Sequence, residues 1–149
     1  MLCKQKVYDH FYALLNSKIE SLQSVLNDLK ESGAGETKST AGDKHETALA
    51  MIQIEQANKR AQMQELLSQK AVLHKINPQL QTGMVVTGSL IKSSTAYYFM
   101  SIAIGKALIE GENVIALSAQ SPLGKILMGA QKGDSISFNQ THLIIEEIL

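Results

Sequence analysis

The polar stretch ETKSTAGDKHET, residues 36–47, decides the fold, because it separates two long segments that both have helical periodicity. A short polar connection between two helices makes them antiparallel neighbours. We therefore expect residues 33–46 to form the tip of a helical hairpin. Carboxylates at such a tip either cap the returning helix or are carried by the hairpin to a distant target.

The segment before this stretch carries a heptad repeat. Large side chains recur at alternating spacings of four and three residues, at Tyr8, Tyr12, Leu15, Ile19, Leu22, Leu26 and Leu29. Such a 3.5-residue repeat is typical of a coiled-coil seam. We expect a helix over residues 4–29, ended by the Gly-rich residues 31–35.

The segment after the stretch, residues 44–76, contains no Gly or Pro and is also predicted to be helical. One heptad seam holds Leu49, Ile52, Met63, Leu66 and Leu73, with polar interruptions at Gln56, Lys59 and Lys70. A narrower stripe beside this seam holds Ile54, Ala57 and Ala61. Pro78 ends the helix, because the residue before a proline is pushed out of helical geometry. The pattern predicts an antiparallel coiled-coil hairpin over residues 1–77 and a linker over residues 78–83.

The periodicity changes from Met84 onward. Short β-prone runs are broken by glycine and serine, and residues 110–113 have the composition of a hairpin turn. Pro122 is placed to begin a short helix. Residues 135–138 and 143–148 are predicted to be closing strands. The sequence therefore predicts an α+β chain whose second part, residues 84–149, is a small antiparallel β-sheet with one short helix.

Composition narrows the classes of function. The formal net charge is zero, whereas a free-standing nucleic-acid binder usually has a basic excess for phosphate contact. Cys3 is the single cysteine, so a disulfide framework within the chain is impossible. No run reaches the roughly 18 apolar residues of a membrane span. These features predict a soluble, cytoplasmic protein with no membrane partner.

The candidate site residues at the tip are Asp43 and Glu46. One interpretation is a helix cap, in which Asp43 accepts a backbone N–H and Glu46 reaches back as in a capping box. The other is that both carboxylates handle a metal ion or water at the end of the hairpin. Two carboxylates are too few to hold Mg²⁺ alone, so a partner would supply the remaining ligands. Glu36 would be a third carboxylate across the turn.

The neighbours of these acids have simpler interpretations. His45 lies in a solvated helix start, and Lys38 and Lys44 balance the nearby carboxylates. The chain has no nucleophile elbow, dinucleotide-binding motif or phosphate-binding loop. The residues therefore predict a binding or delivery device rather than an enzyme with its own active site.

Two stretches carry a resemblance to a known family. Residues 42–48 read GDKHETA, and residues 121–134 read SPLGKILMGAQKGD. In these two motifs the chain resembles the bacterial Gre-type transcript cleavage factors, GreA and GreB. Glu55 and Gln56 stand where that family has a Glu-Gln pair, and the two motifs occur in the same order. Thr47 replaces the family's Asn.

The resemblance implies a fold, a partner and a set of site residues. It implies an FKBP-like C-terminal domain that binds RNA polymerase at the rim of its secondary channel, with Ser121, Pro122 and Leu123 in the contacting loop. It implies that Asp43 and Glu46 reach the polymerase active centre, share a Mg²⁺ there, and stimulate the polymerase to cleave its own backtracked RNA. On this reading the protein binds no cofactor alone, contacts nascent RNA indirectly, and is a monomer.

Three alternatives stay open on the sequence. The first is a secondary-channel regulator of RNA polymerase that does not stimulate cleavage. The second is an FKBP-like prolyl isomerase or chaperone, for which the C-terminal part offers few aromatic residues: Tyr97, Tyr98, Phe99 and Phe138. The third is a structural coiled-coil dimeriser, supported by the regular heptad seam before the tip.

Overall fold

The computed structural model describes residues 2–37 and 42–149, except for the side chains of residues 35–45. The chain divides into two compact units. The first unit combines Met1–Ala13 with Lys70–Leu149, and the second unit is Leu14–Gln69. Each unit is described separately below.

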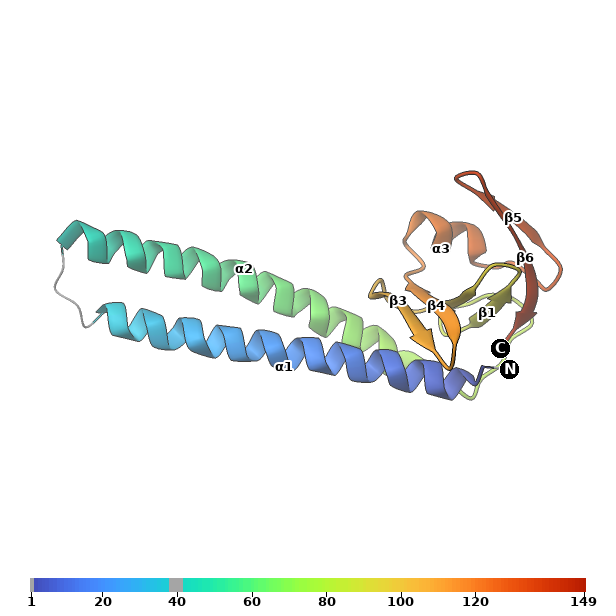
Figure 1. Cartoon of the computed structure of the whole chain (residues 1–149), viewed down its shortest axis with the longest axis horizontal. Helices are drawn as coiled ribbons and strands as arrows, with labels where there is room; N and C mark the ends of the chain where they lie inside the picture. Colours follow the sequence, from blue (N-terminus) through green and yellow to red (C-terminus); the bar gives the residue numbers. More distant parts are fainter. Residues whose placement is uncertain (1, 38–41) are drawn as a thin grey trace. The chain divides into compact units, whose positions relative to one another are not determined.

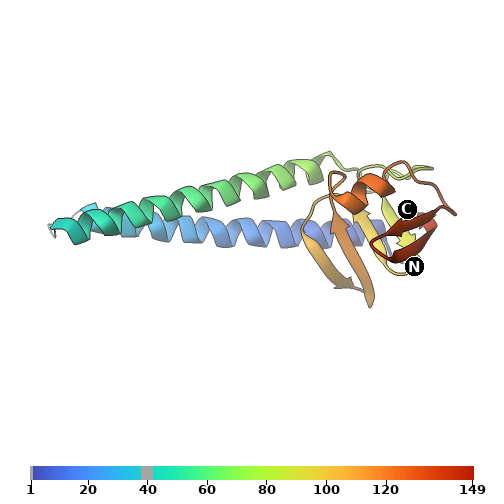
Figure 2. The ribbon, with the colours of Figure 1, turned by 90° about the horizontal axis from the view of Figure 1, so that it is seen from above.

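Two long helices make up the second unit and extend into the first. Helix α1 spans Lys4–Thr37 and helix α2 spans Gly42–Lys75, with 34 residues each. Within the second unit they run side by side in opposite directions (Figures 1 and 2). The hairpin predicted from the polar stretch is therefore present.

Helix α1 does not end at residues 31–35, so the predicted end was wrong. It continues through Gly33 to Thr37. A helical glycine costs only about 1 kcal/mol relative to alanine, which neighbouring contacts readily outweigh. A Cβ placed on Gly33 would lie 3.7 Å from Ile52 Cγ2. Gly33 therefore faces α2 instead of capping α1.

The predicted heptad seam is confirmed by burial in the second unit. Leu15 and Leu22 of α1 and Met63 of α2 are buried. Lys59, one of the predicted polar interruptions, is half-buried on the same seam. Its Nζ forms an ion pair with Glu55 Oε1 at 3.4 Å. The narrower stripe is exposed instead, with Ile54 at 62% exposure.

In the first unit, six strands form one sheet in the order β3-β4-β2-β1-β6-β5 (Figure 1). The strands are β1 Leu90–Ser93, β2 Tyr97–Met100, β3 Gly105–Ile109, β4 Glu112–Leu117, β5 Ser135–Phe138 and β6 Thr141–Ile148. Helix α3 spans Pro122–Leu127. The two long helices, the sheet and this short helix confirm the α+β class.

The sheet is mixed, so the expectation of a purely antiparallel sheet was wrong. Strand β2 pairs with β4 in parallel, from Tyr97 opposite Val114 to Met100 opposite Leu117. The reason is topological. The chain leaves β2, forms β3 at the sheet edge and turns back, so that β4 enters between β3 and β2 in the direction of β2.

Two tight turns set the ends of the sheet hairpins. Glu110 and Gly111 have φ values of 51° and 80°, which is the left-handed geometry of a two-residue hairpin turn. This confirms the turn predicted within residues 110–113. Asn139 and Gln140 adopt the same geometry, at 46° and 66°. Because that turn is so short, β6 begins at Thr141, before the predicted Leu143.

The first turns of α1 cover one face of the sheet. Val7 and Phe11 are fully buried, and the Phe11 and Phe99 rings stack at 6.1 Å between centroids. The heptad pattern did not identify either helix residue as core. Strand β2 is buried along its whole length, which is expected of a strand covered on both faces.

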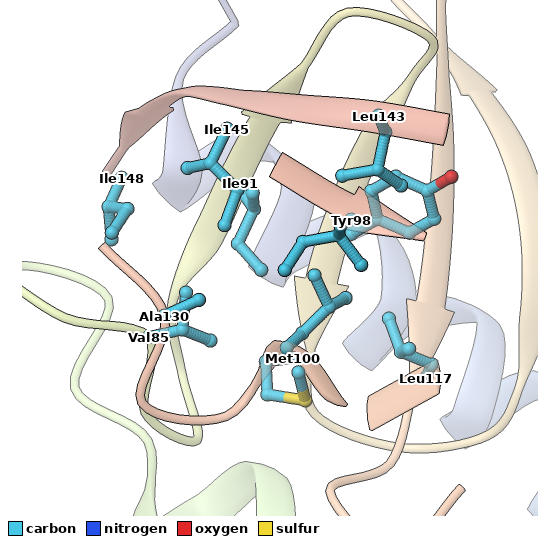
Figure 3. Packing of buried hydrophobic residues seen from close by; sticks show 11 residues of the cluster. Val85, Ile91, Tyr98, Met100, Leu117, Ala130, Leu143, Ile145 and Ile148 are labelled. Atoms are coloured by element: carbon cyan, nitrogen blue, oxygen red, sulfur yellow. The ribbon is translucent and has the colours of Figure 1, made fainter. Parts of the chain in front are cut away.

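On the other face of the sheet, α3 packs on a second cluster of buried side chains, to which strands β5 and β6 also contribute. Tyr98 and Met100 point into this second cluster, because successive residues of a strand face opposite sides. Figure 3 shows Ile91, Leu143 and Ile145 converging on the same space. The complete cluster is Val85, Ile91, Tyr98, Met100, Leu117, Leu127, Ala130, Ile136, Leu143, Ile145 and Ile148.

Hydrogen bonds secure the predicted linker, residues 78–83, to its surroundings in the first unit. Lys4 Nζ donates to the carbonyl oxygens of Leu80 at 2.6 Å and Leu149 at 3.1 Å. Partial burial lowers the pKa of Lys4 below its ordinary value. Gln79 Nε2 also donates to Gln5 Oε1 at 2.7 Å. The segment between α2 and the sheet is therefore held against the start of α1.

None of the helices in the described residues is both long enough and apolar enough to cross a membrane.

Truncating Phe11 tests the core that the first turns of α1 form with the sheet. Phe11→Ala removes a fully buried ring that stacks on Phe99, so we expect a loss of about 3–5 kcal/mol in the free energy of unfolding. The measurement is urea denaturation followed by circular dichroism. Leu108→Ala is the control, because Leu108 is 68% exposed and its truncation should change stability by less than about 0.5 kcal/mol. Equal midpoints for both variants would contradict the described packing.

Candidate functional site

The predicted tip carboxylates both belong to α2. Glu46 is exposed, and Asp43 lies one turn earlier in the helical backbone. The side chain of Asp43 lies outside the described residues, as do those of Glu36, Lys44 and His45. Lys38 lies outside them altogether. The cap and metal interpretations of Asp43 and Glu46 both stay predictions.

The position of these residues at the start of α2 has an electrostatic consequence. A helix N-terminus carries a partial positive charge, which stabilises negative charge in the first turn. Carboxylates at Asp43 and Glu46 are therefore compatible with the helix whether or not they act on a partner. Among the side chains that the structure describes, those of residues 2–34 and 46–149, no three His, Cys, Asp or Glu gather into a group able to hold a metal ion.

The second predicted motif forms a compact turn before α3. Ser121 is the N-cap of α3, and its Oγ accepts a hydrogen bond from the Gly124 N–H at 3.0 Å. The same hydroxyl donates to the Ser118 carbonyl at 2.7 Å. Pro122 occupies the start of the helix, where its missing N–H is not needed. The predicted turn and short helix are both confirmed.

The surroundings of Gly124 explain why this motif has a glycine inside a helix. A Cβ at this position would lie 2.0 Å from the Ser118 carbonyl oxygen and 2.7 Å from Ser121 Oγ. Neither atom is the free end of a long side chain, so a larger residue would displace the turn. Ser121 and Gly124 are therefore required by the local packing of this turn.

The three predicted partner-binding residues have different surroundings. Pro122 is exposed, and Ser121 is half-buried and occupied by the cap. Leu123 is partly buried and packs on the cluster of Figure 3. Among these three, Pro122 is the side chain most available to another molecule.

Sequence reasoning missed apolar residues beside Pro122. Ile126 is 43% exposed and Met128 is 37% exposed. Met84 is 46% exposed, and backbone hydrogen bonds join the next residue, Val85, to Gly129 and Ala130, directly after Met128. We call Pro122, Ile126, Met128 and Met84 the α3 patch. Ile126 was predictable, because it lies four residues after Pro122 on one helix face. Met84 was not, because its placement depends on long-range pairing.

The comparisons with known proteins are limited. No protein-family model matches the chain, and no curated protein matches it. Among solved structures, "Structure of the transcription factor Gfh1" matches with 17% sequence identity and a TM-score of 0.36, covering 92% of each chain. At that identity and TM-score, the match transfers neither a site nor an activity to this chain.

Replacing Gly124 tests the packing of the motif. Gly124→Ala should lower the free energy of unfolding by about 1–3 kcal/mol, because the new methyl group overlaps the Ser118 carbonyl. Gly83→Ala is the matched control, since a Cβ there meets no atom within 4 Å. Thermal unfolding of both variants is the measurement. A fully stable Gly124→Ala protein would show that the turn before α3 is not built as described.

Proposed function

We propose that this protein regulates RNA polymerase, binding it through the α3 patch and presenting Asp43 and Glu46 to the polymerase active centre. The observation that carries the proposal is the structure of the Ser-Pro-Leu-Gly motif. This motif resembles the polymerase-contacting loop of Gre-type factors, and here Pro122 is exposed at its centre. Ile126 and Met128 extend the apolar surface around it.

The helical hairpin is suited to delivery. A 34-residue helix is about 51 Å long at 1.5 Å per residue. Because α1 continues to Thr37 and α2 begins at Gly42, only residues 38–41 separate the two helices. Asp43 and Glu46 both belong to the helical backbone of α2. Positioning of this kind supports catalysis, which is sensitive to displacements of about 1 Å.

The chemistry of the tip fits a shared metal site. Carboxylate oxygens are the ligands that Mg²⁺ prefers, and its octahedral shell needs more oxygens than Asp43 and Glu46 supply. In this proposal the polymerase and its substrate provide the remaining ligands. Bound Mg²⁺ would lower the pKa of a water molecule and so assist hydrolysis of an RNA phosphodiester. Asp43 and Glu46 would orient that water and balance local charge, while the polymerase performs the cleavage.

A regulator that binds without stimulating cleavage is the second candidate. The observation that favours it is Thr47, which stands where Gre-type factors have an asparagine directly after the second acid. In that candidate, Thr47 would offer Glu46 different hydrogen bonds from those of an asparagine. The same protein would then occupy the channel and retune transcription instead of rescuing backtracked complexes.

A transcript cleavage assay separates the two candidates. We expect wild-type protein, mixed with backtracked elongation complexes and Mg²⁺, to shorten the RNA from its 3′ end. Asp43→Ala/Glu46→Ala should lower this rate by about a hundredfold or more, because the carboxylates no longer position water and metal. Glu20→Ala/Glu31→Ala is the matched control, since both acids are exposed elsewhere on α1. Binding without cleavage by the wild type would favour the second candidate.

A binding assay tests the α3 patch separately from the tip. Ile126→Glu should weaken binding to RNA polymerase by about 30-fold, because a charge would be buried in an apolar contact. Ile144→Glu is the control, since Ile144 is comparably exposed, at 51%, but lies on β6. Fluorescence anisotropy of labelled protein titrated with polymerase is the measurement. Equal affinities for both variants would show that the α3 patch does not contact the polymerase.

A further inference from the structure

The α3 patch contains two methionines, and both side chains are accessible to solvent. Met84 is 46% exposed and Met128 is 37% exposed. Among the residues whose side chains the structure describes, the third exposed methionine is Met51 of α2, at 66%. Met63 and Met100 are buried. A small molecule dissolved in water can therefore reach the methionines of the patch far more easily than the two buried ones.

Paired backbone holds both patch methionines in place within the first unit. Val85, the residue after Met84, donates its N–H to the Ala130 carbonyl and accepts a hydrogen bond from the Gly129 N–H, each at 2.8 Å. Met128 directly precedes Gly129 and is the C-cap residue of α3. The two methionines are thus fixed at their backbones, while their side chains stay exposed.

Methionine differs from the other members of the patch in its chemistry. Pro122 and Ile126 carry only hydrocarbon side chains, whereas a thioether is readily oxidised to a sulfoxide. In this reaction the sulfur lone pair attacks one oxygen of hydrogen peroxide, so that an S–O bond forms and the O–O bond breaks. The second oxygen leaves as water with both protons. Sulfur loses the two electrons that the peroxide gains, and an apolar side chain becomes polar.

We propose that the α3 patch is a redox-sensitive contact, in which peroxide oxidation of Met84 and Met128 weakens binding to the partner and reduction of the sulfoxides restores it. The inference rests on the proposed function, in which this patch binds RNA polymerase. A sulfoxide oxygen that is buried in an apolar contact loses its hydrogen bonds to water, which opposes binding. The free protein keeps its fold, because both side chains are already exposed. Oxidation therefore acts on the partner contact and leaves the folded state intact.

The first measurement follows the oxidation of each methionine by mass spectrometry after treatment with hydrogen peroxide. We expect sulfoxide on the three exposed methionines well before the two buried ones, with an unchanged midpoint of thermal unfolding. Cys3 is also exposed and free. Dithiothreitol, added after the peroxide, reduces a disulfide or sulfenic acid at Cys3 and leaves the sulfoxides in place. Oxidation of Met84 and Met128 as slow as that of the buried methionines would overturn the inference.

The second measurement compares the binding of reduced and oxidised protein to RNA polymerase by fluorescence anisotropy. Oxidation should raise the dissociation constant of the wild type by about tenfold. Met84→Leu/Met128→Leu should bind equally well before and after peroxide, because leucine has a similar volume and no sulfur. Met51→Leu is the matched control: it keeps the patch methionines and should lose affinity as the wild type does. Methionine sulfoxide reductases A and B should restore the affinity of oxidised wild type.

Two results of the binding assay would contradict the inference alone. One is wild-type protein that carries both sulfoxides and binds as tightly as the reduced form. The other is an equal loss of affinity in Met84→Leu/Met128→Leu, which would place the sensitive group outside the patch. In both cases the reduced wild type still binds, so the proposed function stands. A reduced wild type that does not bind polymerase would refute the proposed function and this inference together.

Discussion

The first unit depends on the contact between Phe11 and Phe99. The two rings stack at 6.1 Å and both are fully buried. Phe11 belongs to the helix that continues into the hairpin, and Phe99 belongs to the strand between β4 and β1. Because β2 is covered on both faces, one small sheet forms two core surfaces. The first turns of α1 cover one face, and α3 packs on the other, where residues of β5 and β6 complete the cluster.

The second unit is stabilised differently, by a single seam between two helices. Leucines and Met63 occupy the central positions, while Lys59 and Gln56 interrupt the apolar repeat of α2. A two-helix seam has no further layer to cover its flanks, so Val25 and Met51 stay exposed. A hairpin with little bulk is suited to entering a partner, as the proposed function requires.

The α3 motif shows how one short sequence can serve both structure and recognition. Ser121 caps the helix and Gly124 lets the Ser118 carbonyl approach within a distance that a side chain would forbid. Leu123 packs on the core, which fixes the orientation of the helix. Once these residues are held in place, Pro122 and Ile126 face outward together. A rigid turn of this kind reduces the ordering cost of binding a partner.

Local sequence patterns were enough to predict the elements that depend on neighbouring residues. Heptad spacing identified both long helices, the Ser-Pro-Leu-Gly motif identified α3, and Glu110-Gly111 identified a hairpin turn. Each follows from periodicity or from backbone preferences that a few neighbouring residues decide. The same information located Asp43 and Glu46 at the start of α2. Ser121, Pro122 and Leu123 were predicted as partner contacts only from the family resemblance, and the structure added that Pro122 is exposed.

Tertiary structure alone decided the features that depend on distant residues. Helix α1 passes through Gly33 because Ile52 packs beside it, which outweighs a weak local preference. Strand β4 lies parallel to β2 because β3 takes the sheet edge, and no residue within either strand encodes that order. Phe11 is buried because a strand 88 positions further on presents Phe99. Local patterns specify elements, whereas long-range packing selects their partners and their limits.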